Sequence, residues 1–330
     1  MKIAITGANG FEGASLCRYF HNAGHQVIAI GRTKNPHPNL LNYASYLQAD
    51  ILKPIVPLEA DVCIHSASLK SDTASYKDLF LSNVEGTLNV VEASKYCSHV
   101  IHISSSAVYE FGDSPAKEID ASIENDLTDY GETKLLSEEI LHLDIPLAQK
   151  RLILRPRAIY GIGDRVLLPR LFNLLKRKTI FCPVESKIKT SLTNIKNVGY
   201  AIQLFLNQKE LPNLQVFNIA DEHVYSLQDE ILKLLTEIEE EQLNLISIPG
   251  GAINILTRLN SKLKFIRNLN PVLIQSISRN AILDTFCIRK ELNYNPENNF
   301  QNSRLEIAQW VKNMGGKNAY LSNLAMAPWL

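Results

Sequence analysis

The feature that most restricts the fold of this chain is a glycine-rich turn directly after its first apolar run. Residues 3–6 (IAIT) have the composition of a buried strand, and glycines follow at positions 7, 10 and 13. A strand, a tight turn and a helix in this order present backbone N–H groups and the positive end of the helix dipole to a phosphate. We therefore expect a dinucleotide pyrophosphate to bind here, with a glycine turn that has no ligand as the alternative. The residues expected to bind it are Gly7, Asn9, Gly10, Phe11, Glu12 and Gly13.

Apolar runs and longer amphipathic stretches alternate over the first half of the chain. Strands are predicted at residues 3–6, 26–30, 61–65, 100–104 and 151–155, and helices at 12–23, 76–96 and 132–143. Near-continuous apolar strands indicate a sheet that is covered on both faces, and the alternation indicates parallel connections. The prediction is an α/β fold of Rossmann type, a doubly wound parallel sheet, in which ligands bind beyond the carboxyl ends of the strands.

The pattern changes after residue 165. Residues 166–178 and 245–283 are predicted to be helical and basic, with breaks at 249–251 and Pro271, whereas 215–220 has a strand pattern. We therefore predict a nucleotide-binding domain at 1–165 and a smaller, mostly helical substrate-binding lobe at 166–330, from which strands can return to the main sheet.

Composition argues against several other classes of protein. Lys plus Arg and Asp plus Glu number 34 each, so no net field favours nucleic acid or an anionic membrane. The five cysteines are scattered without a CxxC pair, which fits neither a disulfide framework nor a metal site. The chain has no apolar run of membrane-spanning length, and we expect no leader before the first strand. We expect a soluble cytoplasmic protein with a small-molecule substrate.

The end of the second predicted strand bears on the choice of nicotinamide cofactor. A carboxylate here would bind the ribose 2′-hydroxyl of NAD, but the chain has Gly31-Arg32. A guanidinium matches a 2′-phosphate in charge and geometry, so Arg32 favours NADP over NAD, with a solvated surface arginine as the alternative. Asp50 and Ile51, between the second and third predicted strands, could flank the adenine.

Tyr130 and Lys134 have complementary chemistry and lie four residues apart. On a helix this spacing puts the phenol and the amine on one face, one turn apart. A nearby ammonium stabilises a phenolate and lowers the pKa of the tyrosine, which can then exchange a proton with a carbinol or carbonyl oxygen. Ser105 follows the fourth predicted strand, where ligands bind in this architecture, and its hydroxyl can hydrogen-bond the same oxygen.

Several motifs occur in the order that is typical of a known superfamily. They are 6–13 (TGANGFEG), 50–51 (DI), 65–68 (HSAS), 83–87 (NVEGT), 104–109 (SSSAVY), 130–134 (YGETK) and 155–161 (RPRAIYG). Over nearly its full length the chain resembles the extended short-chain dehydrogenase/reductases, the NAD-dependent epimerase/dehydratase group. The last motif is similar to that of the 3β-hydroxysteroid dehydrogenase-like branch.

The resemblance implies roles for individual residues. Tyr130 would be the acid/base, Lys134 would hold the nicotinamide ribose and tune Tyr130, and Ser105 would match the catalytic serine or threonine. Pro156 would lie near the nicotinamide. The other residues that the resemblance places in cofactor-binding motifs are Asp50, Ile51, Ser66, Ala67, Ser68 and Asn83.

For some polar residues in these motifs, the alternative to binding or catalysis is a structural role. We expect Ser104 and Ser106 to support the site rather than react, His65 to position backbone, and Asn83 to tie loops together. The segment 320–330 is expected to dock on the body of the protein or on a second subunit, or to fray.

The residues after Ser105 narrow the reaction. Nucleotide-sugar dehydratases of the superfamily carry an Asp-Glu pair directly after the catalytic threonine, whereas this chain has Ser106-Ala107, so dehydration is not expected. The leading prediction is an NADP(H)-linked oxidoreductase that acts on a secondary alcohol or ketone. The alternatives are a nucleotide-sugar 4-epimerase with tightly bound NAD and a non-catalytic nucleotide-binding sensor. The resemblance also implies a homodimer, formed through residues 78–96 and 132–143.

Overall fold

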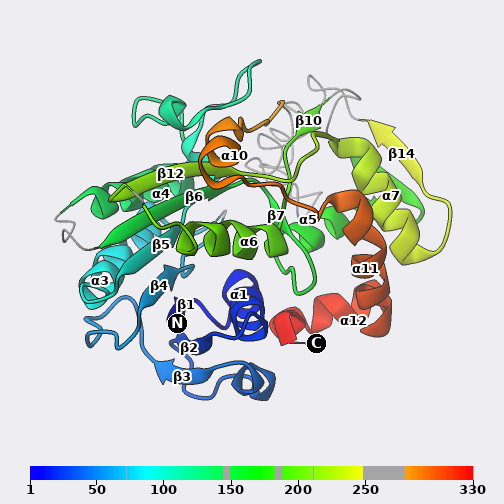
Figure 1. The fold of residues 1–330 in the computed structure, drawn as a ribbon. Helices are drawn as coiled ribbons and strands as arrows, with labels where there is room; N and C mark the ends of the chain where they lie inside the picture. The colour runs from blue at the N-terminus through cyan, green and yellow to red at the C-terminus, as the bar shows by residue number, and fades with distance from the viewer. Residues whose placement is uncertain (72, 144–148, 183–187, 211, 248–278, 330) are drawn as a thin grey trace.

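A parallel sheet of seven strands forms the centre of the molecule (Figure 1), in the order β12-β6-β5-β4-β1-β2-β3. The computed structural model describes residues 1–71, 73–143, 149–182, 188–210, 212–247 and 279–329. The strands are β1 (Lys2–Thr6), β2 (Gln26–Gly31), β3 (Ser45–Gln48), β4 (Val62–His65), β5 (His99–Ile103), β6 (Lys150–Pro156) and β12 (Leu214–Ile219). The order reverses between β1 and β4, which is where ligands bind in such sheets. The predicted doubly wound fold is confirmed.

Helices cover both faces of this sheet, as expected from its near-continuous apolar strands. Helices α1 (Phe11–Asn22) and α6 (Ile195–Leu206) pack on one face, and α3 (Gly86–Ala93) and α4 (Asp129–His142) on the other (Figure 1). Successive side chains of a strand point to opposite faces. Ile3 and Ile5 therefore pack with α1 and α6, whereas Ala4 packs with α3.

The helix predicted at 76–96 is interrupted. It consists of α2 (Tyr76–Phe80), a π-helical turn η2 (Leu81–Glu85) and α3. The wider turn directs Asn83 into the interior, where it is 1% exposed and hydrogen-bonded. A π-turn of this kind is often associated with a functional site.

The second half of the chain adds a helical layer and short sheets. Its elements are β7 (Ile159–Tyr160), α5 (Leu167–Leu174), β8 (Leu175–Lys176), β9 (Thr179–Cys182), β10 (Lys189–Thr190), β11 (Thr193–Asn194), β13 (Tyr225–Ser226), α7 (Leu227–Glu239), β14 (Asn244–Ser247), α10 (Phe286–Leu292), α11 (Phe300–Asn313) and α12 (Gly316–Ser322). The short 3₁₀ turns are η1 (Pro38–Asn42), η3 (Ser106–Val108), η4 (Glu118–Asp120) and η5 (Ala327–Trp329). From this half, β12 returns to the main sheet beside β6.

Two helix predictions in this half were partly wrong. The helix predicted at 166–178 ends at Leu174, because Arg177 has a φ of 53° and turns the chain into the β8–β9 hairpin. Residues 245–247, predicted as helical, belong to β14, which pairs with β9. Residues 248–278 of the same predicted helix lie outside the described residues, and residues 279–283 are not helical but form isolated bridges at Ala281 and Leu283.

The segment that leads to Trp329 docks on the body of the protein, one of the expected outcomes. The Trp329 indole stacks on His37 with 6.1 Å between ring centroids, and the Arg18 guanidinium lies 5.7 Å from its ring. Arg18 also donates a hydrogen bond to the Pro328 carbonyl (2.7 Å). Within the described ranges, the helices are all too short or too polar to cross a bilayer.

Candidate active site

The glycine turn after β1 has the close packing that a pyrophosphate site requires. Gly7 has a φ of 70°, which a residue with a side chain rarely adopts. A Cβ on Gly7 would lie 2.9 Å from the Ala67 Cα, and one on Gly13 would lie 2.4 Å from the Gly7 carbonyl oxygen. The chain then enters α1 with Gly10 at the N-cap, without a side-chain hydrogen bond to the first turn. The first N–H groups of α1 are therefore left for another partner, as a phosphate site needs.

The loop after β2 is tied to this turn. The Asn9 amide donates to the Tyr46 hydroxyl (3.2 Å), which donates to the Thr33 carbonyl (2.7 Å). Gln48 donates to the Arg32 carbonyl (3.3 Å). The Arg32 side chain is exposed and has no carboxylate partner within the described chain. Its guanidinium is therefore available to an anion at the end of β2.

Other predicted cofactor residues lie at strand ends and are held by local contacts. Asp50 follows β3, and its carboxylate accepts from the Leu52 N–H (3.1 Å). The Ile51 carbonyl accepts from the Asn89 side chain (2.8 Å). Pro156 ends β6, beside β12.

The loop after β4 is fixed to β1 and to α4. Ser66 donates to the Thr6 carbonyl (2.7 Å). Asn83 accepts from the Leu69 N–H (2.7 Å) and donates to the Thr133 hydroxyl (3.1 Å). Asn83 thus ties this loop to α4, which is the structural role expected as its alternative.

His65 is a buried support rather than a titrating group. The Thr87 hydroxyl donates to the Asn83 carbonyl (2.6 Å), so it accepts from His65 Nε2 (3.0 Å). His65 Nδ1 then accepts from the Thr6 hydroxyl (2.8 Å). Burial lowers the pKa of His65 to about 3, so the ring is neutral. Its position agrees with the expected structural role.

Close packing between α4 and the turn after β5 brings Tyr130 to Ser105. Thr128 caps α4 by accepting from the Gly131 N–H (3.1 Å). A Cβ on Gly131 would lie 2.2 Å from the Ala107 carbonyl oxygen, so a larger residue does not fit there. Ser105 caps the facing turn η3 by accepting from the Ala107 N–H (3.1 Å).

The Tyr130 hydroxyl is buried and makes no hydrogen bond of normal geometry with the described residues. Burial raises the pKa of Tyr130 above its ordinary value, and the Lys70 ammonium opposes this rise. The hydroxyls of Ser105 and Ser68 also face the phenol and favour its ionised form. The prediction that the pKa of Tyr130 is lowered was therefore wrong for the chain alone, because desolvation of the phenol outweighs the nearby charge of Lys70.

Lys134 lies on the same helix but is directed toward β5. Its ammonium donates to the Ile103 carbonyl (2.9 Å) and lies 3.1 Å from His102 Nε2. Burial lowers the pKa of Lys134 to about 7, and the charge of Lys70 acts in the same direction. His102 was not predicted, because only the fold reveals that this strand residue faces α4.

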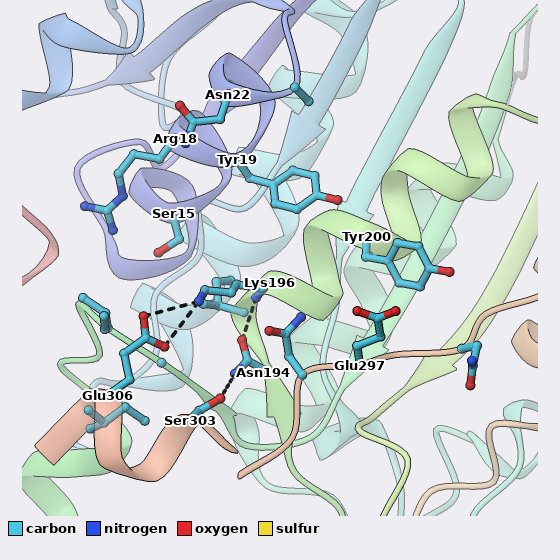
Figure 2. A pocket seen from close by; sticks show the side chains of 17 residues that line it. Ser15, Arg18, Tyr19, Asn22, Asn194, Lys196, Tyr200, Glu297, Ser303 and Glu306 are labelled. Carbon is cyan, nitrogen blue, oxygen red and sulfur yellow. Dashed lines mark hydrogen bonds and ion pairs between the residues drawn. The ribbon is translucent and has the colours of Figure 1, made fainter. Parts of the chain in front are cut away.

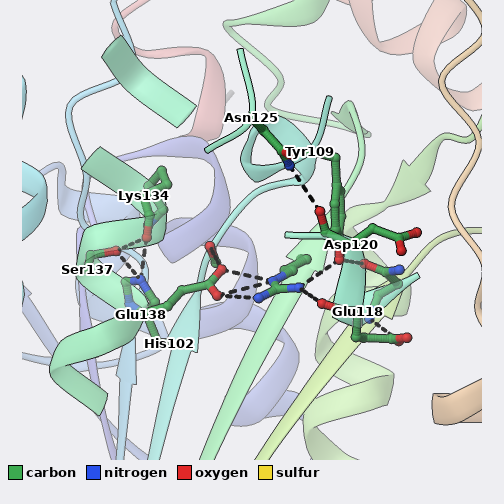
Figure 3. A network of polar contacts seen from close by, with 11 residues as sticks. His102, Tyr109, Glu118, Asp120, Asn125, Lys134, Ser137 and Glu138 are labelled. Carbon is green, nitrogen blue, oxygen red and sulfur yellow. Dashed lines mark hydrogen bonds and ion pairs between the residues drawn. The ribbon is translucent and has the colours of Figure 1, made fainter. Parts of the chain in front are cut away.

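A buried ion pair holds α4 against β6 (Figure 3). Arg155 of β6 lies 2.6 Å from Glu138 of α4, and the two side chains are 6% and 2% exposed. Glu138 also accepts from Ser104, and Arg155 donates to the Tyr109 hydroxyl (2.8 Å). Ser104 therefore supports the site, as expected. Neither charged residue of the pair was predicted as part of the site.

A second ion pair, also not predicted, lies beside Tyr130. Lys70, in the loop after β4, contacts the carboxylate of Glu12 in the first turn of α1. The sequence placed Glu12 in the cofactor turn but gave it no partner, since the two residues are 58 positions apart.

A groove of about 720 Å³ lies away from these residues, between α1, α6 and the segment that enters α11 (Figure 2). Lys196 and Glu306 on its walls form an ion pair of 3.3 Å. The predicted catalytic residues do not line it. The convergence of Ser105, Tyr130 and the glycine turn at the carboxyl ends of the strands is therefore the better candidate.

The chain is similar to known reductases. The chain is 28% identical over 211 residues to a 2-alkyl-3-oxoalkanoate reductase of Stenotrophomonas maltophilia, a match that covers 61% of this chain and 64% of that protein. It is 25% identical to a 4-hydroxy-2-methyl-3-oxo-4-farnesyl-3,4-dihydroquinoline-1-oxide ketoreductase of Stigmatella aurantiaca, with coverage of 89% and 92%.

A solved structure supports the fold as well. UDP-glucuronic acid 4-epimerase from Bacillus cereus, in complex with NAD, superposes with a TM-score of 0.73 at 21% identity, covering 95% of this chain and 99% of that one. The sequence profile of the NAD dependent epimerase/dehydratase family matches residues 3–220, about two thirds of the chain. The chain therefore belongs to the NAD-dependent epimerase/dehydratase family of enzymes.

Proposed function

We propose that the chain is an NADP(H)-linked oxidoreductase that interconverts a secondary alcohol and a ketone. The observation that carries this proposal is the buried Tyr130 hydroxyl, which faces Ser105 and Ser68 without a hydrogen bond of normal geometry among the described residues. A buried hydroxyl that lacks a partner costs about 1–3 kcal/mol. The site is therefore suited to a ligand oxygen that accepts from Tyr130.

The glycine turn fits a dinucleotide. Side chains are missing at Gly7, Gly10 and Gly13, and the first N–H groups of α1 lack a side-chain cap, which leaves room and donors for a pyrophosphate. The exposed Arg32 guanidinium fits a 2′-phosphate, so we assign NADP rather than NAD. A bound nicotinamide supplies or accepts the hydride.

The residues around Tyr130 would then move the proton. In the direction of reduction, Tyr130 donates its proton to the ketone oxygen, and Ser105 donates a hydrogen bond to the same oxygen. The pKa of Tyr130 is raised by burial, so the phenol holds its proton at neutral pH and can donate it, while Lys70, Ser105 and Ser68 favour the phenolate that remains. We assign Lys134 to the nicotinamide ribose, reached by leaving its contact with the Ile103 carbonyl.

The named relatives favour reduction over epimerisation. Both reductases carry a 3-oxo group in the name of the compound on which they act. The UDP-sugar epimerase resembles the chain at a level that supports the fold alone. A ketone on an aliphatic or ring carbon is therefore the first substrate class to test, beginning with a 2-alkyl-3-oxoalkanoate.

Tyr130→Phe tests the proposal. The variant should lose about 100-fold or more of ketone reduction with NADPH, since general acid catalysis contributes this much, while the dissociation constant for NADPH stays nearly unchanged. Tyr76→Phe is the matched control, because that exposed phenol donates to Glu132 and lies outside the proposed chemistry. Turnover of Tyr130→Phe equal to the unmodified protein would refute the assignment.

A further inference from the structure

The ion pair between Glu12 and Lys70 places two opposite charges near the expected phosphate position and near Tyr130. Glu12 puts a negative charge in the first turn of α1, next to the expected phosphate position. Lys70 puts a positive charge close enough to interact with both Glu12 and Tyr130. The side chains of Lys70 and Glu12 are 30% and 12% exposed, so solvent screens the pair only in part.

The loop that carries Lys70 is held in a fixed relation to the phenol. Leu69, the preceding residue, is bound at its N–H and carbonyl by Asn83 (2.7 and 3.2 Å). Asn83 donates to Thr133 (3.1 Å), whose hydroxyl donates to the Tyr130 carbonyl (3.1 Å). Lys70 is therefore placed by a chain of hydrogen bonds that ends at Tyr130, in addition to its ion pair.

Lys134 does not occupy the position that Lys70 has beside Tyr130. Figure 3 shows Lys134 beside His102 and Ser137, and its ammonium lies 3.1 Å from His102 Nε2. Among the charges that act on Tyr130, the cation is Lys70 and the anion is Glu12. Lys134 instead faces Glu138 as well as Lys70 and Glu12.

We infer that Lys70 is a positioning residue that stabilises the Tyr130 phenolate, and that Glu12 holds Lys70 in place and moderates its effect. The inference deepens the proposed function, since it rests on Tyr130 as the acid/base. Glu12, Tyr130 and Asp164 together outweigh the desolvation of Lys70 and raise its pKa, which favours the charged form of Lys70. The Ser105 and Ser68 hydroxyls add uncharged stabilisation of the phenolate.

The two halves of the pair should act in opposite directions. Lys70→Met removes the cation, so the titration midpoint of Tyr130 moves to higher pH. Glu12→Gln removes the negative charge but keeps a side-chain oxygen that can accept from Lys70, so Lys70 stays near Tyr130 and the midpoint moves to lower pH. Simple loss of packing would not give shifts of opposite sign.

The test is an NMR titration of the full chain labelled with ¹³Cζ-tyrosine, in which the signal missing from Tyr130→Phe identifies Tyr130. We expect the Tyr130 midpoint to shift in opposite directions in Lys70→Met and Glu12→Gln. It should be unchanged in the charge-conserving Lys70→Arg. If Lys70→Met does not fold, the downward shift in Glu12→Gln decides alone. An unchanged midpoint in Glu12→Gln, or shifts of the same sign, overturns the inference.

This readout needs neither substrate nor cofactor. Its outcome is therefore separate from that of Tyr130→Phe turnover, which tests the proposed function. If the two shifts are opposite but Tyr130→Phe is still active, Lys70 and Glu12 act on the Tyr130 phenol as inferred. In that case Tyr130 is not the catalytic acid/base.

Discussion

Breaking the buried pair of Arg155 and Glu138 should destabilise the chain strongly. Arg155→Met leaves a carboxylate that is 2% exposed without its cation, and three Arg155–Glu138 hydrogen bonds of 2.6–3.1 Å are lost. Removing one partner of a buried pair costs about 3–5 kcal/mol. With an unfolding entropy of about 2 cal/mol/K per residue over 330 residues, the melting temperature should fall by about 4–7 °C.

This loss of stability is measured by calorimetry and urea unfolding of Arg155→Met, Lys196→Met and the double variant Arg155→Met/Glu138→Gln. Lys196→Met is the control, because it removes a pair with side chains 52% and 47% exposed, and such pairs contribute about 0–1 kcal/mol. Adding Glu138→Gln to Arg155→Met should restore part of the loss, since it removes the uncompensated charge. Equal stability of Arg155→Met and Lys196→Met would refute the reasoning.

Two further predictions concern α4. Gly131→Ala places a Cβ 2.2 Å from the Ala107 carbonyl oxygen, so it should displace α4 and lower ketone turnover by about 100-fold. Gly112→Ala is the control, because a Cβ there would have no atom within 4 Å. Equal turnover of the two variants would contradict this packing. The pKa of Lys134 is lowered from 10.5 to about 7. Between these values the unfolded chain binds more protons than the folded one, so the free energy of unfolding should rise with pH. Lys134→Met should flatten that rise in urea titrations, and an unchanged slope would speak against a buried, neutralised amine.

The sheet was predictable because its strands are buried and the glycine turn fixes where the first βα unit begins. The strand β3 (Ser45–Gln48) was missed, since an edge strand with one exposed side carries no continuous apolar run. The predicted helix at 76–96 hid a π-turn at Asn83, because helical periodicity does not distinguish a wider turn from a regular one. The division at residue 165 stays a prediction, and β12 crosses it to join the main sheet.

The sequence predicted the positions of Ser105, after β5, and of Tyr130, in the first turn of α4, whereas their roles stay predictions. The charged surroundings of the site were not predictable. Lys70 reaches Glu12 across 58 positions, and Arg155 reaches Glu138 across 17, so each pair exists only once the elements are packed. The direction of the Tyr130 pKa depends on burial, which the motif alone does not report.

Cofactor identity is the most direct test of the central claim. The protein is purified without added nucleotide and denatured, any released nucleotide is identified by chromatography, and the emptied protein is titrated with NADPH and NADH by fluorescence. An NADP(H)-linked oxidoreductase should release little nucleotide and bind NADPH more tightly than NADH, with the preference reduced in Arg32→Ala. Retained NAD would instead favour an epimerase that returns its own hydride, and failure to bind either nucleotide would contradict the account.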